Sequence, residues 1–179
     1  GHVVDTFFPD PNVESTSVDG DILLNDQGNV WATEHDKDGT GVGFSAADAA
    51  TETGFRCDAS GTGGNFIINR SFFLYDTSSI PDGNTIDSAT NSYFGFAKAD
   101  NQSDSLNITQ SSPASNTAII VDDFNNYTDL HSAATGATDI TLASYSTTAY
   151  NDFTLNATGL GWISKTGITK LGIRLKKDY

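Results

Sequence analysis

Acidic side chains with a spacing suited to cation binding occur in the segment 34–39, EHDKDG. Glu34, Asp36 and Asp38 stand at every second position and a glycine follows at the sixth, as in the first half of an EF-hand calcium loop. An EF-hand also requires a bidentate glutamate at the twelfth position, where this chain has Ser45. Two interpretations remain open: a looser calcium site formed by Glu34, Asp36 and Asp38, or a solvated acidic loop.

A second group of carboxylates lies earlier in the chain, at Asp19, Asp21 and Asp26. Hard cations accept carboxylate oxygens held in loops, so this group is the other candidate calcium site. Calcium is therefore the candidate cofactor, with either of these two groups as its ligands and a solvated acidic loop as the alternative.

Residue patterns that support catalysis are absent from the sequence. Nucleophilic and acid-base mechanisms need a base that is held by a third group beside an oxyanion site. The chain has three histidines and one cysteine, and it contains no Gly-x-Ser-x-Gly elbow, no His-Glu-x-x-His pattern and no Cys/His ligand set. We predict that the protein is not an enzyme.

Aromatic residues offer a different chemistry, because sugar rings stack on exposed aromatic faces in many jelly-roll binding proteins. The candidates are Tyr93, Phe94, Phe96, Tyr127, Tyr145, Tyr150 and Trp162. For each of them the alternative is burial in the core, which is the usual place for a large apolar ring.

Short apolar segments separated by Gly, Ser, Thr, Asn and Asp must position these side chains, and they are typical of β-strands. We expect about ten strands, at 3–9, 22–24, 30–32, 55–58, 66–76, 86–97, 105–109, 140–144, 149–155 and 170–175. One or two helical turns are expected near 122–127 and 159–164. At 179 residues, this predicts a single all-β domain, a jelly-roll-like antiparallel β-sandwich.

The segment 65–97 organises this expectation. Two apolar strands, 66–76 and 86–97, flank the sequence Ile80-Pro81-Asp82-Gly83. Proline sets φ for the first corner of such a turn, and glycine accepts its exit geometry. We expect a hairpin-type corner here, and a second hairpin joining 22–24 to 30–32.

The run FFLYDTSSIPDGNTIDSAT, residues 72–90, resembles the strand-corner-strand signature of jelly-roll modules known as DNRLRE-type domains. The blocks 111–127 and 150–174, and Phe7-Phe8-Pro9-Asp10 near the start, look like the same group. Such modules occur in secreted, cell-surface and phage-associated or metagenomic proteins. The resemblance implies a fold and an extracellular setting, and it says little about activity.

Two positions depart from these modules. Asn91 stands where similar modules place a leucine, so we expect that face of its strand to be less buried. Similar modules also continue past the segment that matches 171–174 into one more strand, whereas this sequence ends at Tyr179. We expect the missing strand to be supplied by a neighbouring molecule or by a longer parent chain.

The charge balance restricts the possible partners. The chain carries 23 acidic and 9 basic residues, a formal charge of -14, which would repel a nucleic-acid backbone or an anionic membrane surface. No run of about 18 apolar residues is present. We expect neither nucleic-acid binding nor insertion into a membrane.

These observations predict a non-enzymatic structural or adhesion module, located outside the cell, on a cell surface or on a virion. It would act through contacts with other copies, with other surface or virion proteins, or with glycans. Two alternatives stay open: a carbohydrate-binding accessory module, with coplanar exposed aromatics, and a pilus-like or fibre subunit that assembles by strand complementation through an apolar segment such as Val3–Phe8.

Overall fold

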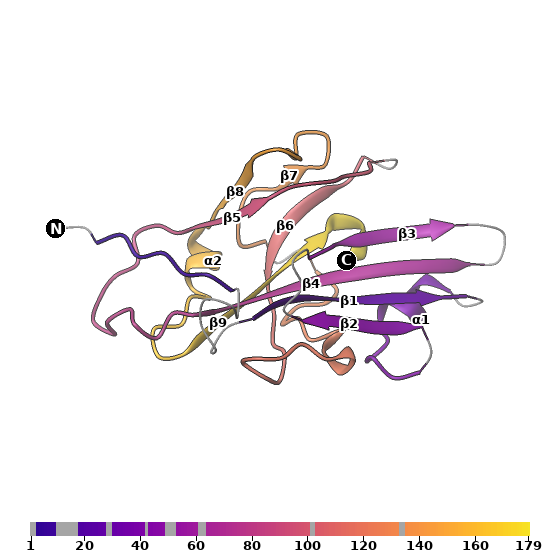
Figure 1. Ribbon diagram of the computed structural model, residues 1–179, viewed down its shortest axis with the longest axis horizontal. Coiled ribbons are helices and arrows are strands. Elements are labelled where there is room, and N and C mark those ends of the chain that lie inside the picture. The colour runs from indigo at the N-terminus through magenta and orange to yellow at the C-terminus, as the bar shows by residue number, and fades with distance from the viewer. Residues whose placement is uncertain are drawn as a thin grey trace.

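The computed structural model describes residues 3–9, 18–27, 30–41, 43–48, 53–60, 64–100, 103–132 and 135–179. These residues form nine strands, two short α-helices and two 3-10 turns (Figure 1). The strands are β1 (Val18–Asp26), β2 (Phe44–Asp48), β3 (Arg56–Ser60), β4 (Asn65–Asp76), β5 (Thr90–Phe94), β6 (Ser105–Gln110), β7 (Ile140–Thr141), β8 (Tyr150–Thr154) and β9 (Ile168–Leu175). The helical elements are α1 (Trp31–His35), η1 (Val121–Asp123), α2 (Ala157–Leu160) and η2 (Lys176–Asp178).

Seven strands form one large sheet in the order β2-β1-β4-β9-β6-β7, with β3 also paired to β4. The other two, β5 and β8, pair with each other as a small second layer. Every one of these strand pairs is antiparallel. The all-β antiparallel sandwich that the sequence predicts is therefore confirmed.

The long strand β4 is the centre of the large sheet, and both of its faces are covered. Phe72 and Leu74 belong to a core on one face, whereas Phe73 belongs to a separate core on the other. Successive side chains of a strand point to opposite faces, so a run in which every residue from 70 to 74 is buried requires a layer on each side.

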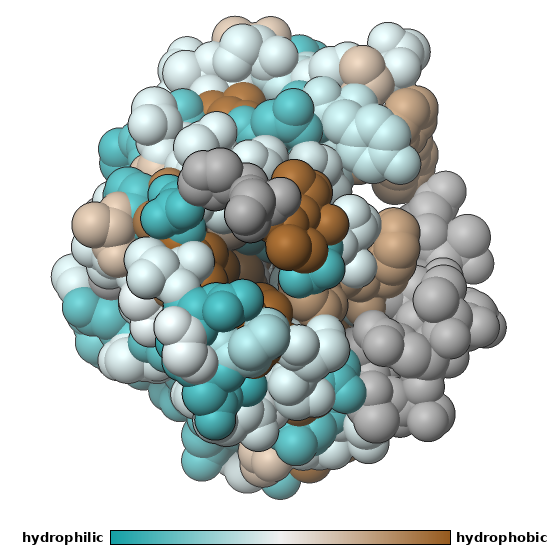
Figure 2. Space-filling model, turned by 90° about the vertical axis from the view of Figure 1, so that its left-hand side faces the viewer, coloured by the Kyte–Doolittle hydropathy of each residue, from teal (hydrophilic) through white to brown (hydrophobic). Residues whose placement is uncertain are grey.

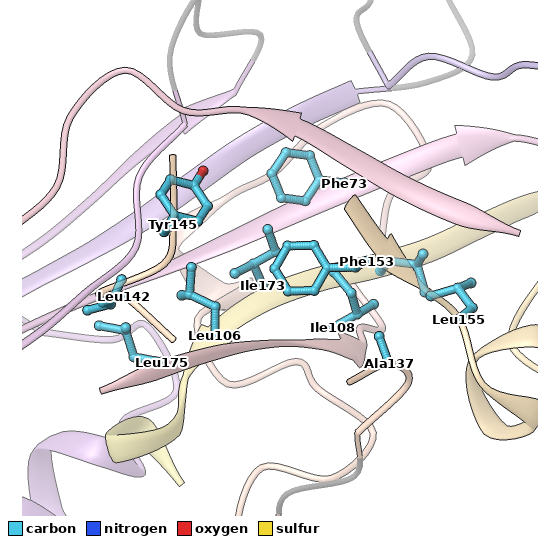
Figure 3. Close-up of a cluster of buried hydrophobic side chains, with 11 residues drawn as sticks. Phe73, Leu106, Ile108, Ala137, Leu142, Tyr145, Phe153, Leu155, Ile173 and Leu175 are labelled. Carbon is cyan, nitrogen blue, oxygen red and sulfur yellow. The ribbon is translucent and has the colours of Figure 1, made fainter. Parts of the chain in front are cut away.

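The first core lies between the two sheets (Figure 3). Phe153 of β8 lies among Leu106 and Ile108 of β6 and Ile173 of β9 (Figure 3). Each of these four side chains is at most 1% exposed, and burial of such a side chain stabilises the fold by about 1.5–3 kcal/mol. This core fixes the position of the small sheet over β6 and β9.

The second core lies on the opposite face of the large sheet, below the segment that contains η1. Tyr127 stacks on Phe72 of β4, with ring centroids 4.9 Å apart, and donates a hydrogen bond to the backbone oxygen of Ser71. Gly172 of β9 makes this approach possible, because a Cβ atom there would lie 2.6 Å from Tyr127 Cε1.

Three local expectations were wrong. The strands that flank Pro81 do not form a hairpin: β4 lies in the large sheet and β5 in the small one, so the corner connects the two layers. Residues 31–35 form helix α1 instead of a strand, and 3–9 is extended but is not part of a sheet. None of the helices in the described ranges is both long and apolar enough to cross a membrane.

Candidate functional site

A groove opens between the small sheet and the large one, where the second layer stops short. Two adjoining cavities of about 680 and 1050 Å³ form it. They share six lining residues: Thr6, Phe7, Tyr75, Thr90, Asn91 and Ser92. The face in Figure 2 shows apolar side chains gathered around a hollow in this region. We call this feature the interlayer groove.

The exposed apolar side chains of the molecule concentrate at this groove. Eight large hydrophobic residues in the described ranges are exposed. Six of them line the groove, two in the larger cavity and four in the smaller one. The six are Val3, Val4, Phe8, Phe94, Phe96 and Tyr150. Apolar patches of this kind mark interaction sites, since single scattered residues are the norm elsewhere on a surface.

The aromatic rings at the rim do not form a flat platform. Phe94 and Tyr150 face each other across the small sheet with centroids 5.3 Å apart, but their planes meet at 82°. A sugar ring that stacked on one of them would meet the edge of the other. The coplanar arrangement expected of a carbohydrate-binding module is not formed by this pair.

A polar cluster lies in the wall of the groove. The Asn91 amide donates hydrogen bonds to the hydroxyls of Tyr75 and Tyr93, at 3.0 and 3.2 Å. Burial raises the pKa of Tyr75 to about 12 and that of Tyr93 well above its ordinary value. Asn91 is half-buried, so the polar side chain at this position ties β5 to β4 through phenol groups that stay neutral.

The strand β5 has an open edge towards the groove. In the described part of the chain it pairs with β8 alone. The neighbouring segment 3–9 is extended and lines both cavities, yet within the described ranges no backbone–backbone hydrogen bond joins it to a strand. Its side chains at Val3, Val4 and Phe8 are 77%, 89% and 54% exposed.

A buried ionic cluster closes the opposite face of the large sheet. Arg70 donates two hydrogen bonds to the Asp178 carboxylate, at 2.8 and 2.7 Å, and Arg174 donates a third at 3.0 Å. Burial alone would raise the pKa of Asp178, but the charges and hydrogen bonds of Arg70 and Arg174 hold it below the ordinary value. The cluster fixes η2 against β4 and β9.

The predicted calcium ligands Glu34, Asp36 and Asp38 do not converge in the structure. Glu34 is buried, and its carboxylate lies 2.8 Å from the ammonium of Lys37. Asp38 accepts hydrogen bonds from the backbone N–H and the hydroxyl of Thr40, which lower its pKa. Asp36 points elsewhere, towards two histidines.

The second predicted group is also divided. Asp19 and Asp21 lie on one face of β1, and Asp26 lies at the end of the strand on the alternate face. Asp21 accepts a hydrogen bond of 2.7 Å from the backbone N–H of Gly54. Asp26 pairs with Lys37, whose hydrogen bond lowers the pKa of the carboxyl group. The ammonium of Lys37 therefore forms ion pairs with both Asp26 and Glu34, one carboxylate from each predicted group.

Sequence reasoning named part of the groove and missed the rest. Phe94, Phe96 and Tyr150 were among the aromatic candidates, and all three are exposed at the rim. Tyr127 and Tyr145 are core residues instead. Side chains of a strand alternate between its two faces, so residues 73 and 75 lie on one face of β4 and residues 72 and 74 on the other. This alternation could have placed Tyr75 on the groove face.

Comparisons with protein-family models, with curated proteins and with solved structures found no match to this chain. The resemblance to DNRLRE-type modules therefore stays a prediction, and the site must be interpreted from its own geometry.

Proposed function

We propose that this chain is a non-enzymatic structural module of a cell surface or virion, and that it binds an extended apolar segment of a neighbouring copy in the interlayer groove. The observation that carries the proposal is the gathering of six of the eight exposed large hydrophobic residues around this groove. Burial of that surface supplies about 25 cal/mol for each Å² removed from water.

The open edge of β5 gives the partner a place to form hydrogen bonds. An extended peptide that adds to a sheet edge gains main-chain hydrogen bonds, and pockets for alternate side chains then select its sequence. Here the apolar walls at Phe73 and Tyr75 of β4 lie beneath that edge. A strand inserted there would lie above β4 and enlarge the small second layer.

The segment 3–9, VVDTFFP, is the candidate donor within this chain. It is extended, rich in β-branched and aromatic residues, and largely exposed, as a strand that pairs with another molecule must be. The single chain leaves Val3 and Val4 in solvent, so transfer of this segment into a neighbour's groove would bury side chains that are exposed in the monomer.

The proposal is tested by comparing two valine substitutions in the full chain. Val4→Asp places a charge in the donor segment, and Val30→Asp is its matched control, an exposed valine (66%) that lies outside both cavities. Val30 is the N-cap of α1, a position that accepts aspartate. Light scattering after size exclusion, with electron microscopy of the same samples, reports assembly.

The parent chain and Val30→Asp should form oligomers or filaments as concentration rises, while Val4→Asp remains monomeric. A parent chain that stays monomeric throughout, or assembly that is equally strong in Val4→Asp, would refute the role of the groove in self-association.

Glycan binding is the second candidate, and the aromatic rim favours it. Phe94, Phe96 and Tyr150 surround a cavity that also exposes Ser92 and Asp152, which could bond to hydroxyl groups. The perpendicular rings limit such a site to one stacked sugar ring at a time. A glycan array on the full chain tests it, and Tyr150→Ala should remove any signal that depends on this rim.

A further inference from the structure

Three potential metal ligands converge on the face opposite the interlayer groove. The donor atoms of His35, Asp36 and His131 all lie within 4.8 Å of one another. Among the described residues this is the one group of three or more such side chains that comes together. His35 is 2% exposed, and the other two side chains are accessible to solvent, at 48% for Asp36 and 67% for His131.

The fold fixes which nitrogen of His35 is available. Its Nε2 atom lies 2.9 Å from the backbone oxygen of Asp178, and a carbonyl oxygen can only accept, so Nε2 carries the hydrogen. Nδ1 lies 2.5 Å from the Asp36 carboxylate, which also can only accept, so a metal bound at Nδ1 would take the place of the hydrogen between these two atoms. Metal-binding histidines typically donate their second N–H to a backbone carbonyl or a carboxylate in this way.

The distances are close to those of a tetrahedral site. Ligand atoms held about 2.0–2.1 Å from a zinc ion are about 3.3 Å apart. Asp36 Oδ1 lies 2.5 Å from His35 Nδ1 and 3.6 Å from His131 Nε2. These two separations differ from the tetrahedral value by less than about 1 Å, and the third, between His35 and His131, is at most 4.8 Å. Movement of the two exposed side chains would bring all three to that spacing while the buried ring of His35 stays in place.

The donor set selects the class of metal. Two imidazole nitrogens and one carboxylate oxygen suit zinc and neighbouring divalent transition metals, whereas calcium takes six to eight oxygen ligands. The Arg174 guanidinium lies 3.4 Å from Nε2, which is the ring nitrogen that does not face Asp36, and Arg70 donates to the backbone oxygen of His35 at 3.0 Å. The Asp178 carboxylate, 3.7 Å from the same nitrogen, balances it.

We propose that His35, Asp36 and His131 form a binding site for a divalent transition metal of the zinc class, with one coordination position open to solvent. The metal would link the C-terminal end of α1 to the segment that follows Tyr127. His35 and His131, the ligands from these two parts, are 96 positions apart in the sequence. This site is separate from the interlayer groove, so its test is independent of the proposed assembly.

The experiment is calorimetric titration of the metal-free full chain with Zn²⁺, and with Ca²⁺ in parallel, in a His2→Ala background that removes the only other histidine. Visible absorption of Co²⁺ reports the coordination geometry. His131→Ala and Asp36→Asn remove one ligand each at exposed positions, and Asp38→Asn is the matched control from the same acidic segment.

One equivalent of Zn²⁺ should bind and raise the melting temperature, because a metal that binds only the folded state stabilises it. His131→Ala and Asp36→Asn should weaken binding at least about tenfold, while Asp38→Asn should not change it. The melting temperature of His131→Ala without metal should equal that of the parent, which separates lost ligation from misfolding. Absence of stoichiometric Zn²⁺ binding, equal affinity in His131→Ala, or preference for Ca²⁺ would overturn the proposal.

Discussion

At the scale of single residues, the buried ionic cluster shows how this chain holds charge inside a small fold. Arg70 and Arg174 are both fully buried, and one carboxylate, that of Asp178, receives hydrogen bonds from both. The other N–H groups of these two arginines donate to backbone oxygens, as in the hydrogen bond from Arg70 to the Phe124 oxygen. Their planes also lie over aromatic rings: Arg70 Cζ is 4.1 Å from the centroid of the Phe124 ring. Asp178 is therefore the key anion of the cluster.

Asp178→Asn should lower the free energy of unfolding by about 3–5 kcal/mol, because it leaves two buried guanidinium groups without a counter-charge. The control is Asp152→Asn, an exposed aspartate bonded to Ser92, for which a change within about 0.5 kcal/mol is expected. Urea unfolding measures both. Similar values for the two variants would show that the cluster does not depend on the charge of Asp178.

The same carboxylate should make stability depend on pH. Its pKa is lowered in the folded state, so the stabilisation is complete above the ordinary value of 3.8 and is lost as pH falls through the lower folded-state value. Unfolding free energies measured from about pH 5 to about pH 2 should therefore fall less steeply in Asp178→Asn than in the parent chain. Parallel curves would contradict this assignment.

The sequence predicted carboxylates for cation binding but not their actual partners. Asp36 was proposed together with Glu34 and Asp38, yet the fold turns it towards His131, which is distant in the sequence. Alternating acids in one segment indicate only where ligands could be. A pairing that spans about half of the chain depends on tertiary packing, which no local pattern reports.

At the scale of elements, strand positions followed from the apolar pattern, whereas strand pairing did not. The strands expected at 66–76, 105–109, 149–155 and 170–175 are present within a few residues. A turn is present at the expected place but one residue later: Asn84 N–H bonds to the Pro81 oxygen at 2.9 Å, so Pro81 is the first residue of the turn and not its first corner. Turn chemistry fixes where the chain changes direction, but the layer that the next strand joins depends on contacts such as Phe153 with Ile173.

Gly39 has a packing role that its place in the acidic segment does not indicate. It occupies the glycine position of an EF-hand-like pattern, but its φ is 86° and a Cβ atom would lie 1.9 Å from the Val121 oxygen of η1. Gly41 has a φ of 104° and open space around it. The first glycine allows two segments to touch, and the second provides only a backbone conformation.

Gly39→Ala should therefore destabilise the protein more than Gly41→Ala. Gly41→Ala should lower the free energy of unfolding only by the cost of a positive φ, about 1–2 kcal/mol. Gly39→Ala has the same cost, and its methyl group must also displace η1. Thermal unfolding of the two variants measures the difference. Equal melting temperatures would show that the contact with Val121 can relax without cost.

At the scale of the whole molecule, the incomplete second layer and the high negative charge act in opposite directions on self-association. The groove offers apolar surface and a free strand edge, while a formal charge of -14 makes identical copies repel each other. Among the described residues, no lysine, arginine or histidine lines the groove to offset that repulsion.

Assembly should consequently strengthen with ionic strength. The Debye length shortens from about 30 Å at 0.01 M to about 8 Å at 0.15 M, so salt screens the repulsion but leaves apolar burial intact. Sedimentation velocity at fixed protein concentration measures this. Weaker association at higher salt would instead indicate an interface formed by opposite charges.

The most direct test of strand exchange is a disulfide trap between two single-cysteine variants. Thr6→Cys marks the donor segment and Ser92→Cys marks the groove, each in a Cys57→Ser background. Mixed and oxidised, they should give a heterodimer linked between residues 6 and 92, well above the yield of Thr6→Cys with Ser78→Cys, an exposed position outside both cavities. A yield no greater than this control, at concentrations where the parent chain assembles, would contradict insertion of one copy's segment into the groove of the next.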